Sequence, residues 1–440
     1  MSEIFELELA ACEALHVACN TSEHLFLTGL AGTGKSTLVR RIIDETDKPV
    51  LIVAPTGIAA TNIGGSTIHS MLGIPLGTYL HTPATADLGF RTFEKSDLFI
   101  KANKVSRAKK LAIRKAKLVI IDEVSMLRAD LLDAINDMLK ILRKSKKPFG
   151  GLQMIFVGDM LQLPPVLCDI EKSIFYQQYE SEFFFAAKSL KTVEIRKVEL
   201  LTIHRQTDPD FISILNNLRT MQLTDADTEL LNATVKPGIS TANGVFITTH
   251  NYKADIINRR MTEKIKHEPR VFEAEIDGYF NPSSVLALEE LTLKKDMRVM
   301  TLINSPESYF NGKMGTITND PELFVNVRFD DGTTAVIVKH TWENITMEYD
   351  AVSCKMRHAV IGTFTQYPLK PAYAITVHKS QGLSFDKAIL DINDVFAAGQ
   401  AYTALSRLRT LEGLTLINPV TTGVQIRMDD KLLEFIKTEP

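Results

Sequence analysis

Short apolar runs alternate with amphipathic stretches along the first two hundred residues. Four of these runs have the length and continuity of buried strands, and they cover residues 25–28, 50–54, 118–122 and 153–158. Between the third and fourth runs, apolar residues recur at helical spacing over residues 128–144, which predicts an amphipathic helix. Continuous apolar strands that alternate with helices predict a parallel sheet covered on both faces.

The same alternation returns in the last two hundred residues. Residues 253–261 predict a helix, and further strands are predicted at 244–249, 372–377, 386–392 and 413–417. Residues 291–349 differ, because short apolar runs at close spacing are separated there by Asn-Gly and Asp-Gly turns, a pattern typical of a small antiparallel barrel or hairpin module. Residues 73–103, rich in Gly, Pro and Thr, predict a smaller insertion. We therefore expect an α/β protein with two parallel-sheet domains, each carrying an insertion.

Composition narrows the class of protein. With 440 residues, 45% of them hydrophobic and 23% charged, the chain is long enough for several cores and is neither disordered nor collagen-like. No stretch approaches the roughly 20 apolar residues that span a bilayer. The first ten residues are acidic, unlike a secretory or transit leader, and the four cysteines form no CxxC pair that would suggest a zinc site or a disulfide framework. We expect a cytoplasmic protein with no membrane partner.

The net charge of −3 by itself argues against a nucleic-acid-binding protein, but the distribution of charge along the chain is uneven and matters more than the sum. Residues 98–121 contain eight Lys or Arg and no acid, and a second basic run covers residues 140–147. Such runs are usually solvated helix faces, so a role in binding a phosphate backbone is the alternative interpretation.

The strongest chemical motif begins where the first strand ends. The sequence GLAGTGKST, residues 29–37, follows a strand and precedes an amphipathic run, as the GxxxxGK[ST] phosphate loop requires. Its glycines let backbone N–H groups surround phosphates at a helix N-terminus. Lys35 is expected to reach the β- and γ-phosphates, and Ser36 to bind Mg²⁺. The predicted nucleotide-binding residues are Gly32, Thr33, Gly34, Lys35, Ser36 and Thr37.

A pair of carboxylates follows the third strand. Asp122 and Glu123 come directly after the apolar residues 118–121. A carboxylate at this strand end is placed to hold the metal of a phosphate-loop enzyme, and Glu123 beside it suits the base that activates water. We predict that Ser36 and Asp122 are the metal ligands and that Glu123 is catalytic.

Three further residues are weaker candidates by themselves. Gln162 lies in the strand-end segment GDMLQLPPV (158–166), where it can sense the γ-phosphate, although such a proline-rich loop is often only a structural turn. Arg205 and Arg407 can supply the positive charge that a phosphoryl-transfer transition state needs. A single arginine carries little weight, so these assignments depend on the wider pattern.

That wider pattern resembles the Pif-type DNA helicases of superfamily 1, relatives of RecD and phage Dda. The resemblance rests on GLAGTGKST, APTGIAATNIGGSTIHS (54–70), IIDEVSM, GDMLQLPPV, LTIHRQ, AYAITVHKSQG (372–382) and AYTALSRLR (401–409), taken in that order. Residues 128–151 resemble the signature region of the family. Residues 364–385, which include the motif AYAITVHKSQG, are also close to the sequence that the family has there. The similarity covers nearly the whole chain.

The resemblance implies two RecA-like domains with ATP in the cleft between them. The first would comprise residues 1–72 and 104–196, with 73–103 as a small wedge-bearing insertion. The second would comprise residues 197–290 and 350–440, with 291–349 as an SH3-like β insertion.

The resemblance also implies a set of functional residues. The ATPase set would be Lys35, Ser36, Asp122, Glu123, Gln162, Arg205 and Arg407. The DNA-binding set would be Pro55, Thr56, Thr67, His69, Thr376, His378, Lys379, Ser380 and Gln381. Short hydroxyls, His and Lys at strand ends can bind phosphates without reading bases. One feature departs from the family, since no Gln occurs before Gln153 and the glutamine that usually recognises adenine is therefore missing.

The sequence thus predicts a monomeric helicase that uses ATP and Mg²⁺, translocates 5′→3′ on single-stranded DNA and unwinds duplex at junctions. The resemblance implies roles in DNA repair, recombination and telomere maintenance. Three alternatives remain open: an RNA helicase of the same superfamily, an ATP-gated nucleic-acid-binding clamp that does not unwind, and a phosphate-loop signalling or transport ATPase. The sequence does not identify the host organism, partner proteins or substrate in the cell.

Overall fold

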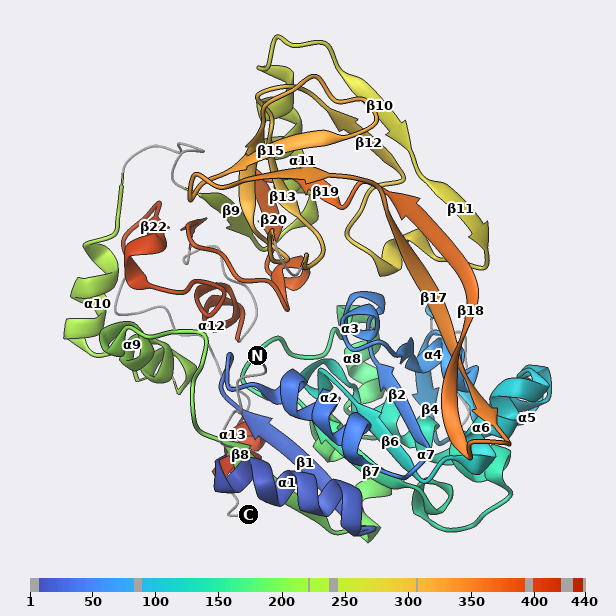
Figure 1. Ribbon diagram of the computed structural model, residues 1–440. Coiled ribbons are helices and arrows are strands. Elements are labelled where there is room, and N and C mark those ends of the chain that lie inside the picture. The colour runs from blue at the N-terminus through green and yellow to red at the C-terminus, as the bar shows by residue number, and fades with distance from the viewer. Residues whose placement is uncertain are drawn as a thin grey trace. The chain divides into compact units, whose positions relative to one another are not determined.

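The chain divides into two structural units, each assembled from segments that are separate in sequence. The computed structural model describes residues 8–82, 89–220, 222–236, 244–305, 308–391, 399–420 and 430–437. Unit 1 takes its residues from 1–204, 345–360 and 428–440, and unit 2 takes its residues from 205–344 and 361–427 (Figure 1).

A six-stranded sheet forms the centre of unit 1. Its strands lie in the order β3-β2-β6-β7-β1-β8, and every neighbouring pair is parallel. The strands are β1 (His24–Gly29), β2 (Val50–Ala54), β3 (Ser66–Thr67), β6 (Leu118–Ile121), β7 (Gln153–Val157) and β8 (Ile195–Leu200). All residues of β2, β6 and β7 are buried, as continuous apolar runs require. The predicted parallel sheet is confirmed.

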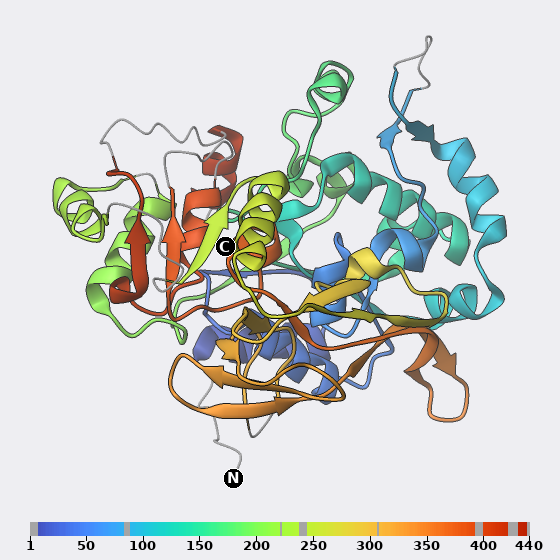
Figure 2. The ribbon, with the colours of Figure 1, turned by 90° about the horizontal axis from the view of Figure 1, so that it is seen from above.

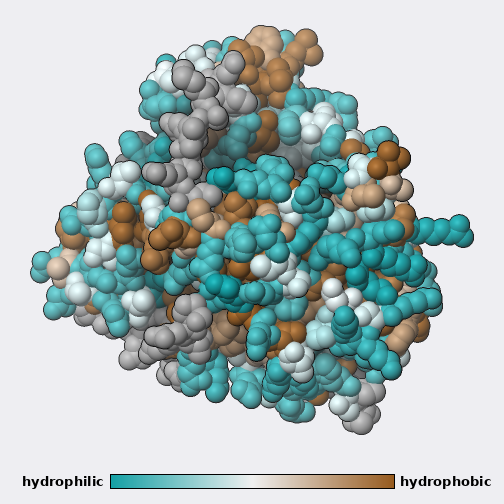
Figure 3. Space-filling model, turned by 60° about the horizontal axis from the view of Figure 1, so that its bottom comes forward, coloured by the Kyte–Doolittle hydropathy of each residue, from teal (hydrophilic) through white to brown (hydrophobic). Residues whose placement is uncertain are grey.

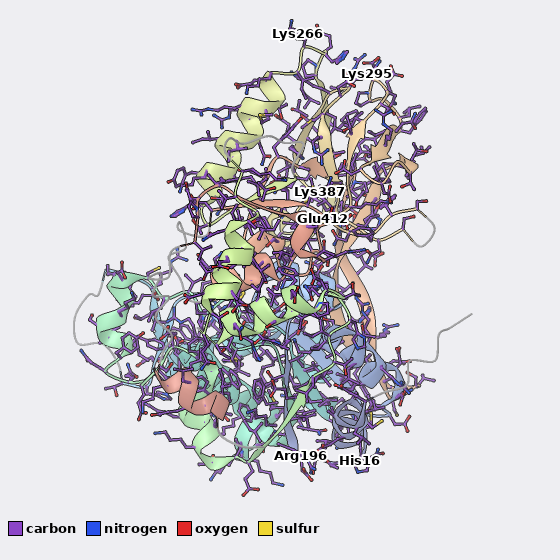
Figure 4. The ribbon with its side chains drawn as sticks, turned by 90° about the vertical axis from the view of Figure 1, so that its left-hand side faces the viewer. His16, Arg196, Lys266, Lys295, Lys387 and Glu412 are labelled. Atoms are coloured by element: carbon purple, nitrogen blue, oxygen red, sulfur yellow. The ribbon has the colours of Figure 1, made fainter. Side chains whose placement is uncertain are left out.

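Helices cover this sheet. In Figure 1, α1 (Leu9–Asn20) and α2 (Lys35–Glu45) lie on the side that faces the viewer. Further helices of unit 1 include α3 (Gly57–Asn62), α4 (Ile68–Leu72), α6 (Arg107–Lys115), α7 (Ala129–Arg143) and α8 (Asp169–Phe175). Arg196 of the edge strand β8 lies at the same end of unit 1 as His16 of α1 (Figure 4), and it pairs with Glu13 of that helix at 2.7 Å. The helix predicted over 128–144 is α7.

The segment predicted as the first insertion is hydrogen-bonded to buried carboxylates of α7. It contains the parallel pair β4 (Thr78–Leu80) and β5 (Thr92–Glu94), followed by α5 (Lys95–Lys104); its residues 83–88 lie outside the described part. Asp130 accepts a hydrogen bond from the Tyr79 backbone N–H at 2.9 Å, and Asp137 accepts one from the Tyr79 hydroxyl at 2.9 Å. Asp130 and Asp137 are seven residues apart, so they lie on one face of the helix.

Unit 2 contains a second parallel sheet, in the order β20-β9-β21-β22. Its strands are β9 (Val245–Thr248), β20 (Ala374–Thr376), β21 (Ala388–Leu390) and β22 (Leu414–Leu416). Its helices are α9 (Pro209–Arg219), α10 (Asp225–Asn232), α11 (Asn251–Glu263) and α12 (Gln400–Leu405). Helix α11 runs alongside these strands (Figure 2), and its Asn258 hydrogen-bonds both the N–H and the C=O of Ala374. The second α/β sheet is therefore also confirmed, although residue 392 of the predicted strand 386–392 lies outside the described residues.

The antiparallel module of unit 2 is larger than the predicted range 291–349. A five-stranded sheet, in the order β16-β15-β14-β13-β19, has its own apolar core. Its strands are β13 (Arg298–Thr301), β14 (Met314–Ile317), β15 (Val325–Phe329), β16 (Thr334–Ile337) and β19 (Leu369–Pro371). Beside it lie β10 (Arg270–Glu273) with β12 (Glu290–Leu293), and β11 (Glu275–Gly278) with β17 (His340–Asp350) and β18 (Lys355–Gln366). Antiparallel strands thus extend from residue 270 to residue 371.

The units differ from the predicted domains at three other places. Residues 197–200 belong to the first sheet, because β8 pairs with β1 along its length. Helix α13 (Asp430–Lys437) belongs to unit 1, where Phe435 stacks on Phe185 with ring centroids 4.4 Å apart. The tip of the β17–β18 hairpin, residues 345–360, also belongs to unit 1, with Met347 buried in its core. None of the described helices is long and apolar enough to cross a membrane.

Candidate active site

The loop between β1 and α2 has the backbone of a phosphate cradle. Gly34 has φ 84°, in the left-handed region that favours glycine, and α2 begins at the next residue, with Leu38 N–H bonded to Gly34 O at 2.9 Å. At Gly29 a Cβ atom would lie 2.5 Å from Leu200 O, so only glycine permits β8 to pass this closely. The loop therefore ends at a helix N-terminus, where backbone N–H groups bind anions favourably.

The side chains of this loop face in two directions. Lys35 Nζ donates hydrogen bonds to Gly29 O at 2.7 Å and to Leu30 O at 2.9 Å, which holds the ammonium above the loop. Thr33 is buried and donates to Leu30 O at 2.9 Å, so its hydroxyl stabilises the turn. Ser36 and Thr37 are exposed. The Lys35 ammonium thus lies over the loop and Ser36 at its surface, whereas the Thr33 hydroxyl supports the turn.

Asp122 and Glu123 lie where β6 ends, in the same sheet as β1. Burial raises the pKa of Asp122, and the nearby charge of Glu123 raises it further, while Lys35 acts in the opposite direction. The structure therefore places Asp122 within electrostatic reach of both Lys35 and Glu123. Glu123 has φ 53°, a left-handed conformation that costs a non-glycine residue about 1–2 kcal/mol. Strain of this kind is common at functional sites.

This donor set fits Mg²⁺. The Asp122 carboxylate and the Ser36 hydroxyl are hard oxygen ligands, and a nearby cation would favour the ionised form of the buried carboxyl. Among the described residues, no group of three or more His, Cys, Asp or Glu side chains is arranged to hold a metal ion. The remaining ligands of a Mg²⁺ ion here would thus be phosphate oxygens and water, as is usual for this metal in nucleotide sites.

The loop after β7 packs against the turn that follows Glu123. At Gly158 a Cβ atom would lie 3.0 Å from Val124 N, so the two loops approach closely. Gln162 is buried, with its backbone N–H bonded to Asp159 O at 3.0 Å and its amide 3.4 Å from the Asp159 carboxylate. Asp159 was not singled out from the sequence, although a carboxylate at a strand end was an available signal.

His204 is another residue that sequence reasoning missed. Its backbone N–H donates to Gly32 O at 2.9 Å, and its ring lies 3.7 Å from the position of a Cβ at Gly34. It therefore lines the phosphate loop directly. Its place immediately before Arg205 in LTIHRQ was the only indication in the sequence.

Arg205 and Arg407 meet at one turn of unit 2. Arg205 Nη1 donates to Ser406 O at 3.1 Å. Arg407 is 3% exposed and donates to Thr403 O at 3.0 Å and to the Ser406 hydroxyl at 2.9 Å. Two arginines that are about two hundred residues apart in sequence thus contact the same residue, Ser406, and their shared role in ATP hydrolysis stays a prediction.

In unit 1, the predicted DNA-binding residues gather at the ends of two paired strands. Ala54 of β2 lies opposite Thr67 of β3, which brings residues 55–56 close to Thr67. Thr56 and Thr67 accept hydrogen bonds from the first turns of α3 and α4, respectively. His69 is held by a hydrogen bond between Nδ1 and Ile74 O at 3.1 Å. Pro55, Thr56 and His69 are half-buried, so all three reach the surface.

In unit 2, only part of the predicted DNA-binding set reaches the surface. Thr376 is buried and its hydroxyl accepts a hydrogen bond from Lys379 N–H at 3.4 Å, while Ser380 is fully buried and donates to Val377 O at 2.7 Å. These two hydroxyls stabilise the 3₁₀ turn His378–Ser380, and the role in DNA binding expected for them stays a prediction. The half-buried residues are His378, Lys379 and Gln381.

Lys370 adds a charge that the sequence gave no reason to select. It lies in β19, and burial together with the charge of Lys379 lowers its pKa to about 8. Burial likewise lowers the pKa of His378. The positive charge beside the turn therefore comes mainly from Lys379 and Lys370.

The acid-free basic run is divided between structural and solvent-facing cations. Lys109 donates to Ser70 O at 2.7 Å and thereby ties α6 to α4, which carries His69. Arg143 donates to the C-terminal carbonyls of α6. Four other cations of the run are exposed and form no ion pair, side-chain hydrogen bond or ring contact within the described part of the chain: Lys101, Lys104, Arg107 and Lys117. Hydrophilic side chains cover most of the face shown in Figure 3.

Comparison with known proteins gives a consistent result. A family model described as "PIF1-like helicase" matches residues 10–229. A Bdellovibrio bacteriovorus protein named ATP-dependent DNA helicase Pif1 is 32% identical over 447 aligned residues, which cover 99% of this chain and 93% of that protein. The human ATP-dependent DNA helicase PIF1 is 32% identical, and the match covers 94% of this chain and 61% of the human protein. The chain thus spans about three fifths of the length of its vertebrate relatives.

Solved structures agree with the fold. A Bacteroides Pif1 in complex with ADP-AlF4 is 36% identical, with a TM-score of 0.86 over 98% of this chain and 96% of that one. A Bacteroides Pif1 bound to single-stranded DNA gives a TM-score of 0.68 at 36% identity, with the same coverage. The Pif1 helicase of Candida albicans gives 0.71 at 29% identity, covering 98% of this chain and 99% of that one. The two parallel sheets of this chain are thus those of RecA-like domains.

Proposed function

Because the chain belongs to the PIF1-like helicase family, we propose that it is an ATP-dependent DNA helicase that translocates on single-stranded DNA and unwinds duplex. One observation carries this proposal. Where the strands of the unit 1 sheet end, Lys35 lies within electrostatic reach of Asp122, beside Glu123, at the N-terminus of a helix whose loop can surround phosphates. This is the arrangement that nucleoside triphosphate hydrolysis requires.

The proposed chemistry of unit 1 follows from these positions. The N–H groups of residues 32–36 and the Lys35 ammonium bind the β- and γ-phosphates, and Ser36 with Asp122 holds Mg²⁺. A Mg²⁺ ion supplies charge neutralisation on the phosphate oxygens. Glu123 orients the attacking water and accepts its proton. Gln162, which Asp159 holds in place, orients the same water or the γ-phosphate. The His204 backbone fixes the loop through Gly32.

Unit 2 is proposed to supply Arg205 and Arg407 for the charge that develops on the transferred phosphoryl group. Such arginines contribute mainly in the transition state. Support comes from their contacts with one turn, where the guanidinium groups of Arg205 and Arg407 both donate to Ser406. The resemblance to a family member bound to ADP-AlF4 is consistent with this assignment.

Single-stranded DNA is proposed to lie on Pro55, Thr56, Thr67 and His69 of unit 1 and on His378, Lys379 and Gln381 of unit 2. These groups are hydroxyls, imidazoles, an amide and a cation at strand ends, and they suit phosphate contacts better than base recognition. A relative is solved with single-stranded DNA bound, which supports the same ligand class here. Thr376 and Ser380 take supporting roles. The exposed cations Lys101, Lys104, Arg107 and Lys117 add long-range attraction for DNA.

Polarity and assembly complete the proposal. We propose 5′→3′ translocation by a monomer, from the family resemblance. No glutamine precedes the phosphate loop, so the nucleotide is held mainly through its phosphates. We therefore expect a weaker preference for adenine than in relatives that carry this glutamine.

Strand displacement on a tailed DNA duplex tests the function. ATP-dependent displacement supports the helicase. DNA-stimulated ATP hydrolysis without displacement would instead support an ATP-gated clamp. Stronger stimulation by RNA than by DNA would support an RNA helicase, because phosphate contacts alone do not distinguish the 2′-hydroxyl.

A further inference from the structure

Gln206 is a buried polar side chain that joins two distant segments of unit 2. It is 2% exposed, and its Nε2 donates to Ser406 O at 3.1 Å and to Leu408 O at 2.8 Å. Both acceptors are main-chain carbonyls, and they flank Arg407. The side chain of Gln206 therefore bridges the residues on either side of a proposed transition-state arginine.

Each main-chain carbonyl of the turn formed by residues 406–408 accepts a hydrogen bond. Ser406 O accepts from both Arg205 Nη1 and Gln206 Nε2, and Arg407 O accepts from the Phe385 backbone N–H at 2.8 Å. Leu408 O accepts from Gln206. Carbonyls that follow the last turn of a helix have no partner within the helix. These bonds from outside α12, together with the bond from Arg407 N–H to Ala404 O at 3.2 Å, therefore fix the backbone of Arg407.

The chemistry of the amide explains why glutamine stands at this position. Its NH₂ group supplies two donors, one for each carbonyl, whereas a carboxylate would present only acceptors to two acceptors. Its own oxygen Oε1 is buried without a hydrogen-bond partner, so the fold retains this side chain despite an unsatisfied acceptor. Unsatisfied buried acceptors are costly, which indicates that the two donated bonds are what the position requires.

We propose that Gln206 is a positioning residue for ATP hydrolysis: it fixes the 406–408 turn so that Arg205 and Arg407 are held in a single, preorganised arrangement. This inference rests on the proposed function of the two arginines. Gln206 itself is assigned no contact with nucleotide. It acts on the reaction only through the turn, in the way that groups around an active site fix the geometry of those that react.

Gln206→Met tests the proposal, because methionine has a similar length and keeps the packing while it removes both donors. ATP hydrolysis at saturating DNA should show kcat lowered between about tenfold and 10²-fold, with KM for ATP within about twofold of wild type. Gln206→Glu should be impaired at least as strongly, since its carboxylate repels the carbonyls.

Gln366→Met is the matched control. Gln366 is also a fully buried glutamine of unit 2 whose Nε2 donates to main-chain carbonyls, with Phe272 O at 2.8 Å, but it lies in the antiparallel module. The melting temperatures of the two variants report how much thermal stability each loses with its buried hydrogen bonds, separately from any change in kcat. The proposal requires that kcat falls in Gln206→Met and not in Gln366→Met at comparable thermal stability.

The double variant Gln206→Met/Arg407→Ala separates this inference from the proposed function. If Gln206 acts through Arg407, the glutamine substitution should lower kcat much less in the Arg407→Ala background than in wild type. Normal kcat in Gln206→Met, or an equal loss of kcat in both backgrounds, would overturn the positioning role while leaving the arginines in place. Normal kcat in Arg407→Ala alone would refute the proposed function of Arg407 instead.

Discussion

The ammonium of Lys35 lies 2.7 Å from the carbonyl oxygen of Gly29, so the phosphate loop holds its own lysine by hydrogen bonds at the point where β1 ends. This contact holds the positive charge of Lys35 over the loop without a ligand. A lysine held in this way is preorganised for phosphate, because little side-chain entropy remains to be lost on binding.

Lys35→Ala should therefore abolish ATP turnover without unfolding the protein. The backbone cradle remains, but the charge that binds the β- and γ-phosphates is lost. Lys109→Ala is the control, since Lys109 also donates to a main-chain carbonyl, at Ser70. Steady-state ATPase assays should show activity only in the control, and wild-type turnover in Lys35→Ala would exclude the enzymatic assignment.

Glu123→Gln should bind ATP and DNA but hydrolyse ATP about 10²–10⁴-fold more slowly, because a positioned general base is lost. The substitution keeps the size of the side chain and its left-handed backbone. Exposed Glu412, which Figure 4 labels in unit 2, provides a Glu→Gln control with normal turnover. Normal hydrolysis by Glu123→Gln would assign the water-activating role to another residue.

Arg205→Lys and Arg407→Lys should each lower kcat far more than affinity for nucleotide. Contacts that strengthen in the transition state are worth about 10³–10⁵-fold, and lysine retains the charge but not the forked geometry. Arg298, paired with Asp330 at 2.7 Å in the antiparallel module, is the control for an Arg→Lys change in unit 2. Parallel losses in nucleotide affinity and in kcat would mark Arg205 and Arg407 as ground-state phosphate ligands.

Binding of single-stranded DNA should be tolerant of sequence and should weaken steeply with salt. The expected log–log slope is about −0.7 for each phosphate neutralised. A triple change of Lys101, Lys104 and Arg107 to Gln should make this slope shallower. A change of Lys266 and Lys295 to Gln should not, since both lie together at one end of unit 2 (Figure 4) and neither belongs to the proposed DNA-binding set. A salt-independent affinity would indicate binding through stacking on apolar surface.

Unwinding should begin from a 5′ single-stranded tail. This expectation comes from the family resemblance, since the phosphate loop is common to helicases of either polarity. Duplexes with only a 5′ or only a 3′ tail distinguish the two directions in a strand-displacement assay. Efficient displacement from the 3′ tail alone would reverse the polarity and leave the ATPase assignment intact.

The sheets and the phosphate loop were predictable because they depend on local pattern. The buried runs at 50–54, 118–122 and 153–158 match β2, β6 and β7 within one residue at each end. Parallel pairing then places Asp122 and Lys35 at the same end of the sheet, beyond the C-terminal ends of β6 and β1. The position of the candidate site in unit 1 was therefore predictable from strand order and periodicity.

What the sequence did not predict depends on long-range contacts. Helix α13 joins unit 1 through the stacking of Phe435 on Phe185, about 250 residues away along the chain, and no local pattern records that partner. The burial of Ser380, the charge of Lys370 and the two bonds of Gln206 likewise depend on which segments the fold brings together. Residue type alone does not distinguish the buried Ser380 and Thr376 from the half-buried His378 as candidates for DNA binding.

The most direct test of the central claim is the rate of ATP hydrolysis by the wild-type chain without nucleic acid, with single-stranded DNA and with single-stranded RNA, measured side by side with Lys35→Ala. The account predicts low basal turnover, strong stimulation by DNA and no turnover by the variant under any condition. Wild-type turnover that single-stranded DNA leaves unchanged would contradict it.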